Sequence, residues 1–416
     1  MNTLVIRGGK PLWGVLHMHG AKNSILPILA ASVLCPGRSV ITRCPELSDV
    51  AAAMEILSHL GGSAERLGDA VVVDAKNACK TQIPGELMTK MRASVNFLGA
   101  LLGRFGEGEL TYPGGCTLGK RPIDYHISAL KTLGVTMEEQ GDRLHFSWKH
   151  RRGGEVFLPF PSVGATENLL LAAVTVPAET VIHNAAREPE VEDLCGYLTA
   201  MGAEISGAGT GTIHIRGGKS LHGTAYCVIP DRIETATYLS MVAACGGHVT
   251  LKNTEGKYLL PVLDTLHACG AKVTAGDKEI SLESTGALLA PAHITTAAYP
   301  GFPTDMQAPM MACLLRAKGE TLVEETVFPQ RFRHVEELRK FGADIYVEGG
   351  RARIRGVEKL HGAEVSVPDL RGGAGLVTAA LQTMEESRIY NCELLKRGYA
   401  DLLINLRLLG ADVTYD

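Results

Sequence analysis

The sequence predicts an α/β protein of two domains, each built from three related units. Three observations lead to this prediction. At 416 residues the chain is too long for one compact core. Two short signals recur at a nearly constant interval along the chain. Apolar helical patterns alternate with β-rich segments, a mixture typical of α/β folds.

The first recurring signal is a bulky residue, a glycine and a small residue at the end of an apolar helical pattern. The central glycines lie 68 to 73 residues apart, at Gly61, Gly134, Gly202, Gly270, Gly342 and Gly410. A β-rich segment follows each of them. A glycine between a helix and a strand is typical of a helix C-cap, so six helix–strand junctions are predicted, three in each domain.

The second signal is a polar tip before each long apolar helix. The tips are residues 22–24, 91–94, 162–168, 231–234, 304–307 and 369–372, and four carry a cation: Lys22, Arg92, Arg232 and Arg371. Unpaired N–H groups and the helix dipole favour anions at a helix N-terminus. If a pseudo-three-fold axis relates the units, three tips converge in each domain, which indicates an anionic small-molecule substrate. For each tip taken alone, simple capping by Ser24, Thr166, Asp305 or Asp369 is the alternative.

The segment 113–122 stands apart from the repeat. It places Cys116 among three glycines and two prolines, next to Lys120 and Arg121. Such a composition predicts an exposed, hinged loop, and the two cations favour a reactive thiolate. We interpret it as a lid that delivers an acid and two cations to a substrate. The alternative is a loop cysteine of no consequence.

Composition narrows the function class. The net charge of −4 gives no support for binding nucleic acid or an anionic membrane. The first ten residues lack the features of a secretory signal, and no apolar run has the length of a membrane span, so a cytoplasmic protein is predicted. The ten cysteines are scattered singly and the fourteen histidines show no metal-ligand spacing. We therefore predict reduced thiols and no metal.

Several motifs resemble those of the UDP-N-acetylglucosamine 1-carboxyvinyltransferases, a branch of the EPSP synthase family of enolpyruvyl transferases. The matching segments run end to end, at 20–24, 114–122, 162–168, 231–234, 301–307, 369–371 and 397–399. The resemblance implies an inside-out α/β barrel, with two domains of three βαβαββ-type repeats related by pseudo-three-fold symmetry. It implies one domain of residues 22–229 that carries the cysteine loop, at about 112–122. Residues 1–21 and 230–416 would form the second domain, with the active site in the cleft between the two.

The resemblance also implies an activity. Such enzymes transfer the enolpyruvyl group of phosphoenolpyruvate to the 3-hydroxyl of UDP-N-acetylglucosamine and release phosphate, the first committed step of peptidoglycan synthesis. Lys22, Arg121 and Arg397 would bind phosphoenolpyruvate. Cys116 would act as general acid toward the methylene carbon, and Asp305 would accept the proton of the sugar hydroxyl, with help from Asp369. Fixed cations suit this chemistry, so no cofactor is predicted.

Further substrate-binding residues follow from the same resemblance. Arg92, Arg331 and Arg371 would line the cationic cleft. The UDP-sugar would contact Asn23, Arg121, Pro122, Ile123, Asp124, Tyr125, Ser162, Val163, Gly164 and Val327. Phe160, Pro329, Gln330 and Lys396 depart from the usual family pattern. With these departures, the substrate affinity or the reaction rate could differ from those of the family. The protein could also be a secondary isozyme.

Three alternative functions remain. A 3-phosphoshikimate 1-carboxyvinyltransferase shares the fold and chemistry, but Lys22-Asn23 and the Gly-Gly-Cys loop favour the nucleotide sugar. A non-catalytic UDP-sugar-binding paralogue would bind the sugar and release no phosphate. A nucleic-acid-acting relative is weakened by the charge and by few aromatic residues. The predicted partners are thus the two substrates, with no nucleic acid and no membrane, for a monomer or weak homo-oligomer.

Overall fold

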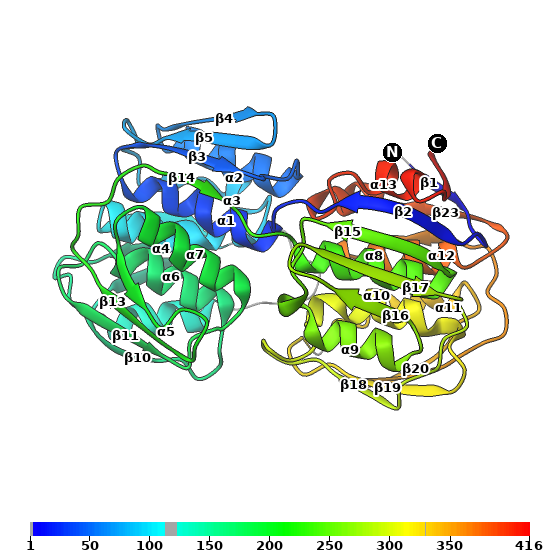
Figure 1. The fold of residues 1–416 in the computed structure, drawn as a ribbon. Coiled ribbons are helices and arrows are strands. Elements are labelled where there is room, and N and C mark those ends of the chain that lie inside the picture. The colour runs from blue at the N-terminus through cyan, green and yellow to red at the C-terminus, as the bar shows by residue number, and fades with distance from the viewer. Residues whose placement is uncertain (1–2, 113–122, 329) are drawn as a thin grey trace. The chain divides into compact units, whose positions relative to one another are not determined.

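The structure is a computed structural model that describes residues 3–112, 123–328 and 330–416. These residues form two compact units. Unit 1 consists of residues 3–19 and 230–416, and unit 2 consists of residues 20–112 and 123–229. Both units mix helices with strands, so the predicted α/β class is confirmed (Figure 1).

Each unit contains three four-stranded sheets within its described residues. The sheets of unit 1, in spatial order, are β2 (Leu12–His17), β15 (Gly247–Lys252), β17 (Glu279–Ser284) and β16 (Lys272–Ala275); β18 (His293–Thr295), β19 (Glu320–Glu324), β21 (Arg351–Arg355) and β20 (Asp344–Glu348); and β22 (Glu364–Ser366), β23 (Glu386–Tyr390), β1 (Leu4–Arg7) and β24 (Asp412–Tyr415). Those of unit 2 are β14 (Ala225–Cys227), β3 (Arg38–Thr42), β5 (Ala70–Asp74) and β4 (Ser63–Leu67); β6 (Gln82–Ile83), β7 (Glu107–Thr111), β9 (Arg143–Ser147) and β8 (Thr136–Gln140); and β10 (Gly154–Phe157), β11 (Glu179–His183), β13 (Thr212–Arg216) and β12 (Glu204–Ser206).

All six of these sheets share one pairing pattern. The first strand pairs in parallel with the second, and the third and fourth add antiparallel, as in β10, β11, β13 and β12. In the sheet of β22 and β23, the third place is taken by β1 from the other end of the chain. The threefold repetition predicted for each domain is therefore present in the strand order of each unit.

Buried helices fill the inside of each unit. In unit 1 these are α8 (Arg232–Cys245), α10 (Gln307–Cys313) and α12 (Leu370–Leu381), which pack against one another (Figure 1). In unit 2, α4 (Asn96–Arg104) packs against α1 (Lys22–Ala31) and α6 (Val163–Ala173). These helices are buried on almost every side, as expected of helices enclosed by protein. A Cβ atom on Gly375 of α12 would lie 2.9 Å from the carbonyl oxygen of Ala308, so glycine permits the close approach of α12 to α10.

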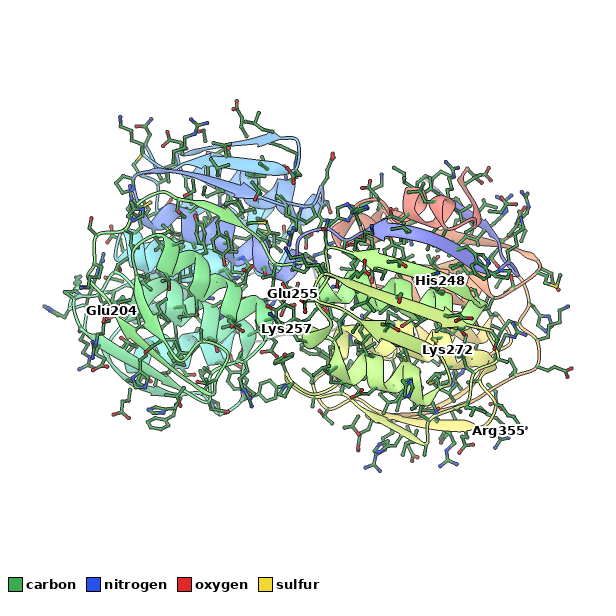
Figure 2. The ribbon with its side chains drawn as sticks, viewed as in Figure 1. Glu204, His248, Glu255, Lys257, Lys272 and Arg355 are labelled. Atoms are coloured by element: carbon green, nitrogen blue, oxygen red, sulfur yellow. The ribbon has the colours of Figure 1, made fainter. Side chains whose placement is uncertain are left out.

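The sheets lie outside these helices. Glu204, Lys272 and Arg355 on three different sheets point away from the helices into solvent (Figure 2). Helices inside and sheets outside are the arrangement that the family resemblance implies, and it is confirmed in each unit. The remaining helices are α2 (Ser48–His59), α3 (Gly85–Met88), α5 (Asp124–Thr132), α7 (Pro189–Ala200), α9 (Leu260–Ala268), α11 (Val335–Arg339) and α13 (Leu402–Leu408). Short 3₁₀ turns are η1 (Ser32–Leu34), η2 (Arg92–Val95), η3 (Gly256–Tyr258), η4 (Thr304–Met306), η5 (Leu314–Arg316) and η6 (Cys392–Arg397).

The six recurring glycines lie where the sequence places them. Each follows one of the helices α2, α5, α7, α9, α11 and α13 and precedes the next strand. Their φ angles lie between 86° and 105°. A side chain is strained in that region of backbone conformation, whereas glycine adopts it freely. The predicted helix C-caps are confirmed.

His19 is the last residue of the N-terminal part of unit 1, and two carboxylates contact its ring. Its Nδ1 lies 3.0 Å from Oε1 of Glu234, and its Nε2 lies 3.1 Å from Oδ2 of Asp401. The hydrogen bond to Glu234 raises the pKa of His19 to about 9, although burial opposes the change. His19 is therefore a cation at neutral pH and stabilises unit 1 through both contacts.

His19→Gln is expected to lower the free energy of unfolding by about 2 to 3 kcal/mol at neutral pH. The folded chain binds this proton more tightly than the unfolded chain. The gain is full below pH 6.5, the ordinary histidine pKa, and is lost as the pH rises through about 9. Urea unfolding across this range should give a falling stability for the natural protein and a flatter profile for the variant. Equal slopes for the two proteins would contradict the assignment.

Candidate active site

The six polar tips all lie at the starts of buried helical segments. Four of the segments are the α-helices α1, α6, α8 and α12, and the other two begin with the turns η2 and η4. Asp369 accepts hydrogen bonds from the N–H groups of Arg371 and Gly372, and Ser162 accepts one from Ala165. Capping is thus a real role of Asp369. Asp305 is different, because the residue that caps its turn is Pro303.

Asp305 lies between two buried arginines in unit 1. Its Oδ1 accepts a hydrogen bond of 2.6 Å from Nη2 of Arg331, and its Oδ2 accepts one of 3.2 Å from Nη2 of Arg371. Both arginine side chains are 4% exposed, whereas Asp305 is 26% exposed. The arrangement holds a carboxylate in place from behind and leaves part of it accessible.

Further contacts fix the two guanidinium groups. Nη1 of Arg331 donates to Oγ1 of Thr304 at 2.9 Å, and the Arg371 guanidinium lies 5.4 Å from the centre of the Tyr399 ring. Burial acts to lower the pKa of Arg371, but Tyr399 and Asp305 outweigh it and raise the pKa above its ordinary value. Arg371 therefore carries a permanent positive charge beside Asp305.

Several buried polar atoms near these residues have no hydrogen-bond partner within the described part of the chain. They are Nε of Arg331, Nη1 of Arg371, Nε2 of His334, Oδ2 of Asp369 and both side-chain polar atoms of Gln307. An unpaired buried polar atom is costly, and such atoms are uncommon away from functional sites. The donors among them, Nε of Arg331 and Nη1 of Arg371, carry positive charge and suit a small anionic ligand.

Unit 2 contributes a second group of predicted site residues. Lys22 begins α1 and forms an ion pair of 2.9 Å with Asp49, the second residue of α2. Asn23 and Arg92 are half-buried at the starts of their helical segments. The first turn of α6 holds the half-buried Val163 and Gly164 behind Ser162. At the start of α5, Ile123 is buried, whereas Asp124 and Tyr125 are exposed.

The remaining predicted residues lie in unit 1 or outside the described residues. Arg397 ends η6 and is half-buried, and the N–H of the half-buried Val327 donates to Glu325 at 2.9 Å. Nζ of Lys396 lies 6.0 Å from the centre of the Tyr415 ring. Cys116, Arg121, Pro122 and Pro329 lie outside the described residues.

Sequence reasoning missed several residues that contact the predicted site. Asp49, His334 and Tyr399 contact Lys22, Arg331 and Arg371, respectively. Only the spacing of Tyr399 from Arg397 gave a signal, through the 397–399 motif. Asp49 lies in the first turn of α2 and His334 is the N-cap of α11, and nothing in the sequence pattern marks either as a partner of the site.

The remaining sequence predictions concern the cysteines, metal ligands and membrane-spanning helices. All nine cysteines in the described ranges are free thiols, and six of them are buried. Within the same ranges, no three His, Cys, Asp or Glu side chains are grouped as metal ligands would be. No helix in the part of the chain that the structure describes is long and apolar enough to cross a membrane.

Fold and site together define a class of protein: an α/β protein of repeated units in which two buried arginines hold a partly accessible carboxylate. The model of the EPSP synthase (3-phosphoshikimate 1-carboxyvinyltransferase) family matches residues 6–406. The chain belongs to this family.

The relatives and solved structures agree with this assignment. A UDP-N-acetylglucosamine 1-carboxyvinyltransferase 2 of Caldanaerobacter subterraneus subsp. tengcongensis is 45% identical over 413 residues, covering 99% of each chain. A UDP-N-acetylglucosamine 1-carboxyvinyltransferase 1 of Halalkalibacterium halodurans is 42% identical over 415 residues, 99% of this chain and 94% of that one. The enolpyruvyl transferase NikO of Streptomyces tendae superposes with a TM-score of 0.90 at 26% identity, covering 100% and 99% of the chains. An EPSP synthase of Acinetobacter baumannii, 18% identical with a TM-score of 0.76 and full coverage of both chains, shows the shared fold alone.

Proposed function

We propose that this protein transfers the enolpyruvyl group of phosphoenolpyruvate to the 3-hydroxyl of UDP-N-acetylglucosamine and releases phosphate. The observation that carries the choice of acceptor is the identity of 42% to 45% with relatives of that name over nearly the whole chain. The position of Asp305 between Arg331 and Arg371 supports the chemistry. In this role the protein catalyses the first committed step of peptidoglycan synthesis.

The proposed reaction is an addition followed by an elimination. Asp305 accepts the proton of the sugar 3-hydroxyl as the oxygen bonds to C2 of phosphoenolpyruvate, and Cys116 protonates the methylene carbon C3. The product of this addition is a tetrahedral ketal. Loss of a proton from C3 and cleavage of the bond between C2 and the phosphate oxygen then give the enolpyruvyl ether and phosphate. Asp369, the N-cap of α12, assists the proton transfers through its Oδ2, which accepts no hydrogen bond from the described residues.

Cations stabilise the charges of this reaction. We assign phosphoenolpyruvate to Lys22, Arg121 and Arg397, while Arg92, Arg331 and Arg371 add positive potential. The UDP-sugar is assigned to Asn23, Arg121, Pro122, Ile123, Asp124, Tyr125, Ser162, Val163, Gly164, Asp305 and Val327. We further propose that the two compact units are the two domains of the family fold. Our proposal includes action in the cytoplasm as a monomer or weak homo-oligomer, without nucleic acid.

The decisive experiment measures phosphate release from phosphoenolpyruvate with UDP-N-acetylglucosamine or shikimate 3-phosphate as the acceptor. Release with the nucleotide sugar alone is the expected result. Release with shikimate 3-phosphate alone would overturn the choice of acceptor. Binding of UDP-N-acetylglucosamine without any release of phosphate would instead support the non-catalytic paralogue.

Cys116 is expected to be the one cysteine alkylated by a fosfomycin-type epoxide. Burial raises the pKa of the Cys44 and Cys269 thiols to about 11, which makes them poor nucleophiles. Intact-mass spectrometry should show a single adduct, absent from Cys116→Asp, and that variant should stay active because aspartic acid can still donate a proton. Cys79→Ser, which removes an exposed thiol, is the control and should still be modified. An adduct on another cysteine would contradict the proposed role of Cys116.

A further inference from the structure

Asn168, in the second turn of α6, connects three helices of unit 2. Its Oδ1 accepts a hydrogen bond of 2.6 Å from the N–H of Gly99 on α4. Its Nδ2 lies 2.8 Å from Nδ1 of His126 on α5 and donates to the carbonyl of Gly164 at 3.2 Å. A backbone N–H can only donate, so the contact with Gly99 fixes which end of the Asn168 amide carries the oxygen. The amide therefore presents its NH₂ group to His126.

This orientation also fixes the state of His126. Because Nδ2 of Asn168 donates, Nδ1 of His126 must accept, and the ring proton lies on Nε2. Burial, with a smaller contribution from the positive charge of Arg92, lowers the pKa of His126 to about 3. His126 is thus a neutral imidazole of one tautomer across the range in which enzymes are usually assayed.

The His126 ring lies against the first turn of α6. A Cβ atom on Gly164 would lie 2.8 Å from Cε1 and 3.1 Å from Nε2 of His126, closer than side chains tolerate. The ring therefore covers the backbone at Gly164, and glycine is required at this position. Asn168 contacts the same backbone through the Gly164 carbonyl.

These contacts end in two segments that carry predicted acceptor-binding residues. His126 directly follows Ile123–Tyr125 in the first turn of α5, and Gly164 belongs to the segment 162–164 of α6. Neither His126 nor Asn168 is itself among the residues assigned to a substrate. We propose that Asn168 and His126 are positioning residues that fix the first turns of α5 and α6 relative to each other, so that both can bind the nucleotide sugar. This inference rests on the proposed function and adds to it.

The test compares the Michaelis constants of the two substrates. His126→Phe keeps a ring of similar size but removes the acceptor, which leaves Nδ2 of Asn168 without its best partner. We expect the KM for UDP-N-acetylglucosamine to rise about tenfold and the KM for phosphoenolpyruvate to change less than about twofold. His126→Gln retains an acceptor and should restore most of the loss. A uniform fall in activity with both KM values unchanged would overturn the inference.

Tyr197→Phe is the matched control. It also removes one buried hydrogen bond of unit 2, from the Tyr197 hydroxyl to Oγ of Ser39 at 3.1 Å, away from both segments. Both KM values should stay at those of the natural protein. If Tyr197→Phe raised the KM for the nucleotide sugar as much as His126→Phe does, general loosening of unit 2 would be the cause and the inference would fail.

A readout that does not depend on activity is the tautomer of His126. Nitrogen-15 NMR of the natural protein should show a neutral ring protonated on Nε2, and Asn168→Asp should raise the pKa of His126 because a carboxylate then faces Nδ1. A ring protonated on Nδ1 in the natural protein would overturn the inference. This measurement also separates the two proposals, because failure of phosphate release in the natural protein leaves the tautomer result as it is.

Discussion

Asp305→Asn is expected to lower kcat for phosphate release by about a thousandfold, the effect of removing a positioned base. The asparagine amide has nearly the same shape as the carboxylate but cannot take the proton of the sugar hydroxyl. Steady-state kinetics with phosphoenolpyruvate and UDP-N-acetylglucosamine would measure the change. Asp344→Asn, at an exposed position at the start of β20 in the same unit, is the control and should retain full activity.

The contacts of Asp305 bear directly on this expectation. Arg331 and Arg371 each donate to one carboxylate oxygen, and together they stabilise the ionised form. Nε of Arg371 also donates to Oδ2, at 3.3 Å, so both oxygens are held in place. Because 26% of the side chain is exposed, a substrate hydroxyl can still reach the carboxylate. Retention of more than about a tenth of kcat by Asp305→Asn would show that another group is the base.

The same variant separates catalysis from folding. Removing the carboxylate charge leaves two buried guanidinium groups without their anionic partner, which is strongly destabilising when a buried ion pair is broken. A lower midpoint of thermal unfolding is therefore expected together with the loss of kcat. A cooperative thermal transition that stays well above the assay temperature would establish that the variant remains folded under assay conditions, so that the kinetic loss reports chemistry.

Local features of the fold could be predicted from the sequence because they depend on neighbouring residues. Gly61 and its five counterparts adopt a left-handed backbone conformation at a helix end. A single glycine between a helical pattern and a β-rich pattern is enough to predict this conformation. The polar tips can be recognised in the sequence for a similar reason, because the unpaired N–H groups at a helix start favour polar residues there. The pairing of β1 with β23 and β24 joins opposite ends of the chain, and no local pattern specifies it.

In the site, too, local features could be predicted from the sequence and long-range contacts could not. Lys22, Asp305 and Arg371 could be placed at helix starts from the sequence, but their partners could not. Arg331 and Arg371 lie 26 and 66 residues from Asp305, and only the tertiary fold of unit 1 brings them together. The sequence also left open whether Asp369 and Asp305 are helix caps, and the structure distinguishes the two residues. Asp369 is an N-cap, whereas Asp305 is held as an ion by two arginines.

The largest pH-dependent effect on stability is expected at Glu167. This residue of α6 is buried, and Oε2 accepts a hydrogen bond of 2.9 Å from Asn96 on α4. Burial raises the pKa of Glu167 to about 8, the hydrogen bond from Asn96 opposes the shift, and Glu190 and Glu188 add to it. Glu167 is therefore mostly protonated at neutral pH, and its ionisation in the folded chain is costly.

Glu167→Gln should stabilise the protein in alkaline solution. The folded chain holds the Glu167 proton more tightly than the unfolded chain, so the free energy of unfolding falls as the pH rises from about 4.5 to about 8, by about 5 kcal/mol in total. Glutamine is neutral at every pH and can still accept from Asn96, so the variant should lack this decline. Urea unfolding should show the variant more stable than the natural protein above pH 8, with the difference vanishing below pH 4.5.

His19→Gln is expected to have the opposite effect on stability. His19 and Glu167 both bind a proton more tightly in the folded chain, but for different reasons. His19 gains its proton through an attractive contact with Glu234, so replacing it removes stability. Glu167 keeps its proton because burial penalises the charge, so replacing it removes a penalty. Each substitution should flatten part of the same pH profile, yet they should shift stability in opposite directions. Glu279→Gln, on the exposed start of β17, should leave the profile unchanged. A loss of stability in Glu167→Gln at alkaline pH would mean that the charged carboxylate has a compensating partner in the folded protein.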